Sequence, residues 1–301
     1  GPEDPVTWYR NDNSGNPGGF SVSNFQKLPF ETGGSLNNGK RIAVADIDGV
    51  NGLDVLVSES NYGYFLNDGS ENFTFTSLDF RNRTGQLYNL PTDMAPADLD
   101  SDNDIDIVSV FNFGDFPDPW DELTWIEANG AGVLDSNPAT DGENTYEQLI
   151  DDDSEATPNH RVIAADINGD GNVDLVGSVR DRGFANEALY LYENDGDDTF
   201  TKSVIAEGNM SGDDISAIDI DDDGDVDILV ADEDNQDVLI WVNDGSEAFT
   251  KQVVASGVSA TYPTSAAVGD FNGDGRKDVV FVSDFGIDFK DDVVWYEVLA
   301  P

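Results

Sequence analysis

An acidic segment of nine residues occurs five times in this sequence. The copies align without gaps and begin at Asp46, Asp98, Asp166, Asp219 and Asp270, so they start 52, 68, 53 and 51 residues apart. A repeat length near 50 residues indicates one supersecondary unit per copy, with successive units stacked on one another. We therefore expect a single repeat domain over residues 1–301, and the spacing of 68 indicates an insertion, at about residues 111–160, within the second repeat.

Short apolar runs flank each acidic segment. The run before it is rich in small residues, as at residues 42–45, and the run after it is β-branched, as at residues 279–282. A third run is aromatic and ends in Asn-Asp-Gly at residues 67–69, 194–196 and 243–245, a turn that leads into a fourth run opened by Phe. Such runs between turn residues are typical of strands. Each repeat is thus predicted to be a four-stranded antiparallel sheet with the acidic loop between its first and second strands.

Four-stranded sheets in series predict an all-β fold, a β-propeller whose first strands surround the central channel. The pattern gives 21 strands, which make five blades of four strands with one strand left over. Five blades is the expected number, and six or seven remain open. The N-terminal strands, within residues 1–40, are expected to complete the last blade and close the ring.

The acidic loops have the composition of an oxygen-ligand metal site. Asp outnumbers Glu about threefold in this chain, and positions 1, 3, 5 and 9 of the loops carry mostly carboxylates or amides. Hard cations such as Ca²⁺ take six to eight oxygen ligands at roughly 2.3 to 2.6 Å. Gly or Asn at position 6 allows the left-handed backbone that wraps a loop around an ion. The loops lack the Glu at position 12 of an EF-hand, and strands rather than helices flank them.

The whole pattern, Asp-x-Asp/Asn-x-Asp-Gly-x-x-Asp, then an apolar strand, then an aromatic strand ending in Asn-Asp-Gly, resembles the FG-GAP/VCBS repeat family, which includes the integrin α-chain propeller. The resemblance covers about residues 41–297, and Trp8 to Asp12 match the aromatic strand alone. It implies an extracellular calcium-binding β-propeller used for adhesion or ligand binding, in a family that includes lectins and a few enzymes.

The resemblance also assigns the calcium ligands to positions 1, 3, 5 and 9 of the loops. These are Asp46, Asp48 and Asp54; Asp98, Asp100, Asp102 and Asp106; Asp166, Asn168, Asp170 and Asp174; Asp219, Asp221, Asp223 and Asp227; and Asp270, Asn272, Asp274 and Asp278. Val50 stands at position 5 of the first loop, so we expect that site to be the weakest or empty. About five structural Ca²⁺ ions are therefore expected.

Calcium affinity also bears on location. Extracellular calcium modules bind with dissociation constants of roughly 10⁻⁴ to 10⁻³ M, so such sites fill where free calcium is millimolar and stay empty in cytosol. A secreted or cell-surface protein is therefore predicted. Residues 1–5 have neither the basic nor the apolar region of a signal peptide, so any export signal is expected to have been removed or to lie outside this sequence.

The net charge of −48 argues against several partners. So acidic a chain repels the phosphates of nucleic acids and anionic membrane surfaces, and no apolar run is long enough to insert into a bilayer. The chain has no Cys, which excludes disulfides. The acidity exceeds what five ions neutralise, and it fits a marine or high-salt source and a generally acidic secreted protein equally well.

Catalysis has little support in the sequence, and we expect a protein that is not an enzyme. His160 is the only histidine, and with 62 acidic residues a pair of close carboxylates is no indication of glycoside hydrolysis. The leading hypothesis is a module that binds an extracellular glycan or a surface protein. Aromatic faces suit sugar rings, although the same aromatic residues suit packing of the insertion onto its blade. The candidate ligand-binding residues are Phe113, Phe116 and Trp120 of the insertion, with Arg81 and Arg83.

Two alternatives stay open. One is a structural subunit of a cell-surface assembly, in which a terminal strand at residues 6–11 or 293–298 self-assembles by pairing with a neighbouring molecule's sheet edge. The other is a carbohydrate-active enzyme, a lyase or hydrolase, on a propeller scaffold.

Overall fold

The computed structural model describes residues 7–11, 25–29, 41–58, 63–70, 72–78, 91–111, 122–128, 147–151, 159–179, 187–196, 199–208, 210–256, 262–284 and 292–297. Every regular element in these stretches is a β-strand, so the predicted all-β fold is confirmed. The strands form antiparallel sheets of consecutive segments, which are the predicted blades.

Four blades have four strands each. They are blade one, β3 (Arg41–Ala45), β4 (Asp54–Ser58), β5 (Gly63–Asn67) and β6 (Phe73–Ser77); blade two, β7 (Asp93–Ala97), β8 (Asp106–Phe111), β9 (Glu122–Ile126) and β10 (Glu147–Asp151); blade three, β11 (Asn159–Ala165), β12 (Asp174–Val179), β13 (Ala188–Asn194) and β14 (Phe200–Glu207); and blade four, β15 (Asp214–Ile218), β16 (Asp227–Asp232), β17 (Asp237–Val242) and β18 (Thr250–Ala255). Blade five has the three described strands β19 (Tyr262–Gly269), β20 (Asp278–Asp284) and β21 (Asp292–Tyr296).

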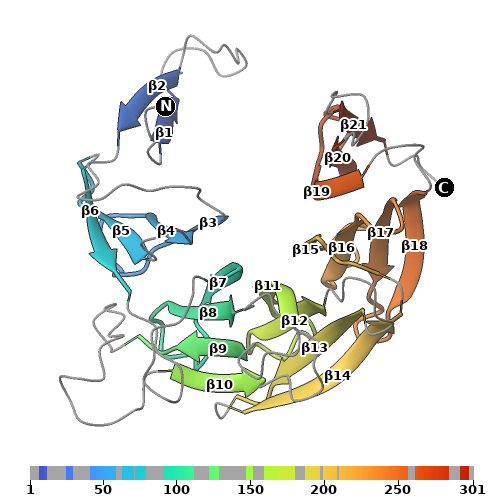
Figure 1. The fold of residues 1–301 in the computed structure, drawn as a ribbon, viewed down its shortest axis with the longest axis horizontal. Coiled ribbons are helices and arrows are strands. Elements are labelled where there is room, and N and C mark those ends of the chain that lie inside the picture. Colours follow the sequence, from blue (N-terminus) through green and yellow to red (C-terminus); the bar gives the residue numbers. More distant parts are fainter. Residues whose placement is uncertain are drawn as a thin grey trace.

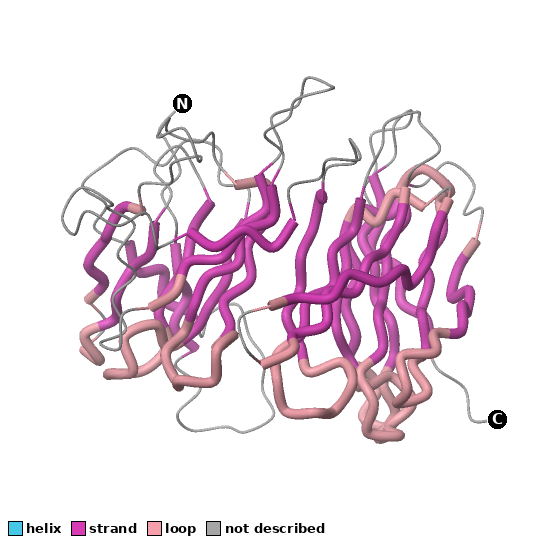
Figure 2. The backbone as a smooth tube through the Cα atoms, turned by 90° about the horizontal axis from the view of Figure 1, so that it is seen from below, coloured by secondary structure: helices cyan, strands magenta, loops and turns pink. Residues whose placement is uncertain are grey.

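The five blades surround a common centre as a five-bladed β-propeller (Figure 1). The first strand of each blade lies innermost, and β6, β10, β14 and β18 lie at the periphery. Antiparallel pairing places the turns between first and second strands, and those between third and fourth strands, at the same end of every blade. Most of the described loops accordingly lie on one face of the molecule (Figure 2).

The N-terminal strands differ from expectation. β1 (Thr7–Asn11) and β2 (Phe25–Pro29) pair with each other in a separate two-stranded sheet, and among the described strands neither is bonded to blade five. The predicted completion of the last blade by these strands is therefore not seen.

Of the insertion expected at residues 111–160, the structure describes β9, β10 and short adjoining stretches. Residues 112–121, 129–146 and 152–158 lie outside the described part.

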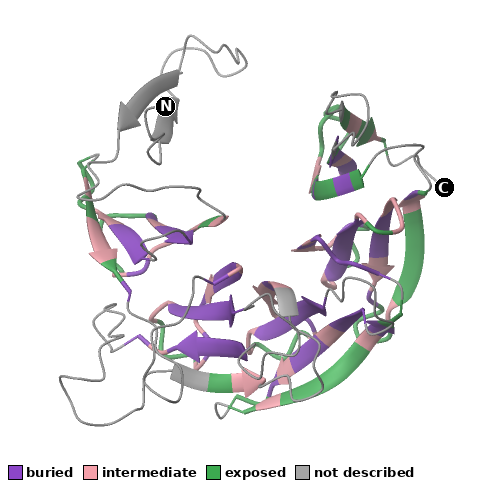
Figure 3. Ribbon diagram, in the orientation of Figure 1, coloured by how far each residue is buried: buried purple, intermediate pink, exposed green. Residues whose placement is uncertain are grey.

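The hydrophobic core lies in the seams between neighbouring blades. Because side chains alternate across a strand, each second strand serves two seams. In β8, Ile107 joins the core shared with blade one, whereas Val108 and Val110 join the core shared with blade three. Exposed residues are concentrated on the outer strands β14 and β18 (Figure 3). Each aliphatic side chain buried in a seam contributes about 1.5 to 3 kcal/mol, which makes the seams the main source of stability.

A series of polar side chains occupies equivalent places on the five inner strands. The residue five places before each loop is Arg41, Asp93, Arg161, Asp214 or Ser265 in blades one to five. Arg41 forms ion pairs with Asp93 (Nε to Oδ1, 3.5 Å) and with Asp214 (Nη1 to Oδ1, 3.8 Å). The Ser265 hydroxyl donates to Asp214 Oδ2 at 2.6 Å. Burial lowers the pKa of Arg161 to about 10, although Asp93 and Asp214 favour its charged form. Opposite charges thus alternate along the inner strands of blades one to four.

Candidate metal centres

The aspartate at position 9 is fully buried in all five loops. Its Oδ2 accepts a hydrogen bond from the position-2 N–H of the same loop at 2.8 to 3.1 Å. In loops one to four its Oδ1 accepts a second bond, at 2.7 to 2.9 Å, from a backbone N–H at the end of the third strand. This aspartate therefore anchors the loop to its blade, a role that the sequence analysis, which assigned it only to the metal, did not predict.

Burial changes the acidity of these anchors. Desolvation raises the pKa of Asp106 to about 7, and the amide hydrogen bonds from Ala128 and Leu99 only partly offset it. Burial likewise raises the pKa values of Asp54, Asp174 and Asp227. A nearby cation would favour the ionised form of each carboxyl group.

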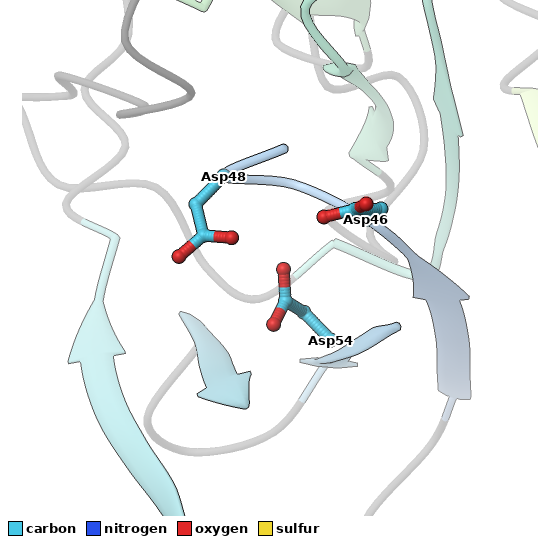
Figure 4. Close-up of side chains that lie close together, drawn as sticks. All are labelled: Asp46, Asp48 and Asp54. Carbon is cyan, nitrogen blue, oxygen red and sulfur yellow. The ribbon is translucent and has the colours of Figure 1, made fainter. Parts of the chain in front are cut away.

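Three loops bring three carboxylates together, from positions 1, 3 and 9. In each group the facing oxygen atoms all lie within 4.8 Å of one another. Figure 4 shows the first group, in which Asp46, Asp48 and Asp54 point toward one another. The other two groups are Asp98, Asp100 and Asp106, and Asp219, Asp221 and Asp227. The predicted ligands at these three positions are thus assembled, including those of the first loop.

One buried oxygen in each of these three groups has no hydrogen-bond donor. It is the Oδ1 atom of the position-1 aspartate, in Asp46, Asp98 and Asp219. In loop four, Lys277 from the neighbouring loop lies 3.8 Å from Asp219 Oδ1 and bonds Asp222 Oδ1 at 2.5 Å. A buried carboxylate oxygen without a donor is costly. A set made only of oxygen donors, with net negative charge, fits a hard divalent cation such as calcium.

Loops three and five have a different arrangement, because position 3 is Asn168 or Asn272. Here the position-1 aspartate is satisfied by the loop backbone. Asp166 Oδ1 accepts from the N–H groups of Gly169 and Asp170 at 2.8 and 3.1 Å, and its Oδ2 accepts from Gly171 at 3.0 Å. Asp270 accepts the same three bonds in loop five, at 2.7, 3.1 and 2.9 Å.

Position 5 shapes the loop. Asp102, Asp170, Asp223 and Asp274 each accept, through Oδ1, the N–H two residues later at 2.8 or 2.9 Å. The left-handed backbone expected at position 6 is confirmed in every loop, with φ between 69° and 98° at Asn51, Asn103, Gly171, Gly224 and Gly275.

The Asn of the Asn-Asp-Gly turns has a role that the sequence reading missed. Asn194 Nδ2 of blade three donates to Leu99 O, in the loop of blade two, at 2.8 Å, and Asn243 Nδ2 of blade four donates to Ile167 O, in the loop of blade three, at 2.9 Å. Each side chain also donates to the position-8 carbonyl of its own loop. Adjacent loops are thus linked across two seams.

The candidate ligand-binding residues Phe113, Phe116, Trp120, Arg81 and Arg83 all lie outside the described residues. The structure therefore does not test whether these residues lie close together. Trp125, an aromatic residue of the same insertion, is buried in β9 and packs in the core between blades two and three. Among the described residues, no helix has the length and apolar character needed to cross a membrane.

A comparison with protein families matches the repeats that contain three of these loops. The FG-GAP-like repeat family matches residues 166–230 and 219–281, which span loops three to five and the strands that follow them. The chain contains FG-GAP-like repeats. Together with the blades, these matches are consistent with an FG-GAP repeat β-propeller, as the sequence pattern indicated. FG-GAP repeats commonly bind calcium and are typical of extracellular proteins.

Solved structures similar to this chain include a six-bladed fungal lectin from Aleuria aurantia, with 12% identity, TM-score 0.44, and coverage of 82% of this chain and 72% of the lectin. A protein from Bifidobacterium bifidum that is assigned as an exo-β-1,3-galactanase has 8% identity, TM-score 0.47, and coverage of 84% and 85%. The exo-β-1,3-galactanase from Phanerochaete chrysosporium has 7% identity, TM-score 0.48, and coverage of 85% and 59%. A comparison with curated proteins gave no match.

Proposed function

We propose that this propeller is a non-catalytic, calcium-stabilised extracellular module that binds a glycan or a surface protein. The observation that carries the calcium part is the buried, donorless Oδ1 of Asp46, Asp98 and Asp219, each within a group of three carboxylates. A divalent cation would provide the missing partner for this oxygen and would attract all three carboxylates of the group.

Electrostatics favours a bound cation over an empty loop. Two unit charges 4 Å apart interact by about 4 kcal/mol at an effective dielectric constant of 20, so three ionised carboxylates in one group repel one another strongly. In loops one, two and four, the residues at positions 1, 3 and 9 would hold the ion. In loops three and five, the Asn at position 3 would replace one carboxylate, and the position-1 aspartate would exchange backbone N–H groups for the metal.

The proposed role of the ion is structural. At about 1 mM free calcium and dissociation constants of roughly 10⁻⁴ to 10⁻³ M, each site would stabilise the fold by about 0.4 to 1.4 kcal/mol. Five sites would contribute about 2 to 7 kcal/mol, a large part of the roughly 5 to 15 kcal/mol that keeps a domain folded. A contribution of this size from calcium to the stability of the fold supports a protein that functions outside the cell, where free calcium is millimolar.

Two experiments test the proposal. Excess EDTA should lower the melting temperature by roughly 5 to 15 °C, and calcium, but not an equal ionic strength of sodium chloride, should restore it. An unchanged melting curve would contradict structural calcium.

A glycan array in calcium should show binding that EDTA abolishes and that Trp120→Ala weakens. Release of oligosaccharides from an acidic polysaccharide would contradict the non-catalytic role.

A further inference from the structure

Loop five carries a positive charge at a position that is apolar in every other loop. Position 8 is Lys277 in loop five, and it is Leu53, Ile105, Val173 or Val226 in loops one to four. Val173 and Val226 pack against the core that their blade shares with the preceding blade. A side chain at position 8 therefore faces the preceding blade, which for Lys277 is blade four.

The side chain of Lys277 ends in loop four, beside the proposed metal ligands. Its Nζ donates to the backbone carbonyl of Asp219 and, at 2.5 Å, to Asp222 Oδ1, and it lies 3.8 Å from Asp219 Oδ1. Asp219 Oδ1 is the buried oxygen without a hydrogen-bond donor, in the group that Asp219 forms with Asp221 and Asp227. The ammonium group is thus within ion-pair distance of an oxygen that a divalent cation would bind.

The bond from Lys277 to loop four takes the place of a neutral bond at two other seams. In blades three and four, Asn194 and Asn243 at the end of the third strand donate to a carbonyl of the preceding loop. The register of β20 with β21 places Glu297 at the same point of blade five, and a Glu carboxylate has no N–H to donate. Blade five therefore contacts the preceding loop through a charged group where blades three and four use an amide.

Loop four has the most carboxylates of the five loops. Its nine residues include six Asp, against five in loop two and three in each of the others. Without a metal ion these like charges repel one another, and the ammonium group of Lys277 partly neutralises them. With a divalent cation at loop four, the same ammonium group would be a like charge close to the ion.

We infer that Lys277 is a tethered cation that competes with the divalent ion for loop four, so that this lysine sets the calcium affinity of the loop. Lys277 stabilises the metal-free loop as its counter-ion, and calcium binding displaces the ammonium group from Asp219 and Asp222. The link between blades four and five is thereby coupled to the ion at loop four. The inference rests on the calcium site of the proposed function, and it adds to that site a regulating residue from the neighbouring blade.

Calorimetric titration of the full chain with calcium tests the inference. Lys277→Val, which gives loop five the residue of loops three and four, should raise the calcium affinity of one site by about tenfold or more, because the competing charge is gone. Lys277→Arg keeps the charge and should retain the affinity of the unsubstituted chain. The matched control is Lys251→Val on β18, which removes an equal charge from an exposed lysine whose Nζ lies 5.9 Å from the centroid of the Trp241 ring, and it should leave calcium affinity unchanged.

A double substitution assigns the effect to loop four. Asp219→Asn removes a ligand from that loop, and in this background Lys277→Val should no longer tighten calcium binding at any site. An equal gain in affinity in the two backgrounds would overturn the inference, because Lys277 would then act on another loop.

Melting temperatures separate competition from a purely structural role. In EDTA, Lys277→Val should melt at a lower temperature than the unsubstituted chain, because loop four has lost its counter-ion. In saturating calcium this deficit should shrink or reverse, since tighter binding adds stability that grows with calcium concentration. A lysine that only links two blades would lower the melting temperature equally in both conditions, and that result would overturn the inference.

Failure of the inference can be told apart from failure of the proposed function. If neither the unsubstituted chain nor Lys277→Val binds calcium, the proposed function fails, and the inference fails with it. If the unsubstituted chain binds calcium and Lys277→Val binds it with the same affinity, or if Lys251→Val tightens binding as much, the calcium sites stand and only the role of Lys277 is overturned.

Discussion

Loops one, two and four have Asp at position 3, whereas loops three and five have Asn there. Where that residue is Asp, three carboxylates lie together and the position-1 aspartate keeps a buried Oδ1 without a donor. Where it is Asn, the position-1 aspartate accepts three backbone N–H groups. The same motif therefore occurs in two arrangements: in one the position-1 aspartate keeps an oxygen without a hydrogen-bond donor, and in the other the loop backbone supplies the donors. We expect the two kinds of loop to depend differently on calcium.

The largest expected effect is one that the two kinds of loop share. Asp106→Ala in loop two and Asp174→Ala in loop three each remove an anchor that accepts two buried backbone N–H groups. Because each orphaned donor costs about 1 to 3 kcal/mol, both variants should lose about 2 to 6 kcal/mol in the free energy of unfolding, measured with urea. Glu207→Ala, at an exposed site on β14, is the control and should stay within about 0.5 kcal/mol. Stability loss confined to loop two would show that the anchor acts through the metal alone.

Substitutions at position 1 should affect calcium binding differently in the two kinds of loop. Asp219→Asn in loop four removes a charge from a group of three carboxylates and should weaken calcium binding at that loop at least tenfold, about 1.4 kcal/mol. Asp270→Asn in loop five should leave the tighter class of sites unchanged in a calorimetric titration. Equal losses in the two variants would remove the distinction between the loops.

A substitution at position 3 should make a loop of the second kind resemble one of the first kind in its calcium affinity. Asn168→Asp gives loop three a third carboxylate, and its calcium affinity should rise by about three- to tenfold, because ligand charge tunes the affinity of such sites. Asn172→Asp adds the same charge at position 7, outside the predicted ligand set, and serves as the control. If the two variants tighten binding alike, net charge rather than the position-3 ligand explains the difference.

The smallest expected effect is on pH dependence. Burial raises the pKa of Asp106 to about 7, so between its unfolded value near 3.8 and pH 7 the folded state binds more protons than the unfolded state. In EDTA, stability should therefore rise as the pH falls from 7 toward 4, whereas with calcium bound it should fall, because protons compete with the ion. Asp106→Asn should flatten the EDTA profile, as thermal melts across this range can establish. A rise in stability with pH in EDTA would contradict the burial argument.

The local features of this fold could be predicted from the sequence. The strands, the blades and the left-handed position 6 follow from side-chain period and turn chemistry within about ten residues. The anchoring role of position 9 could not be predicted, because one of the N–H groups that its carboxylate accepts from lies at the end of the third strand. The link from Asn194 to Leu99 O joins residues 95 positions apart in different repeats, and nothing within a single repeat indicates it.

The N-terminal strands show the same limit. Trp8 to Asn11 were recognised as resembling a third strand, yet ring closure was predicted from strand number alone. The register of Asn11 with Phe25 became visible only in the pairing of the two strands. The predicted weakness of the first loop stays a prediction, although Asp46, Asp48 and Asp54 lie as close together as their counterparts in loops two and four.

The alternation of Arg41, Asp93, Arg161 and Asp214 along the inner strands has a consequence for assembly. Similar repeats can exchange places during folding, because their apolar seams are nearly interchangeable. Exchanging blades two and three would place Arg41 beside Arg161 and Asp93 beside Asp214, and like charges in contact are unfavourable. The alternating charges on the inner strands therefore favour one order of neighbouring blades over the exchanged order.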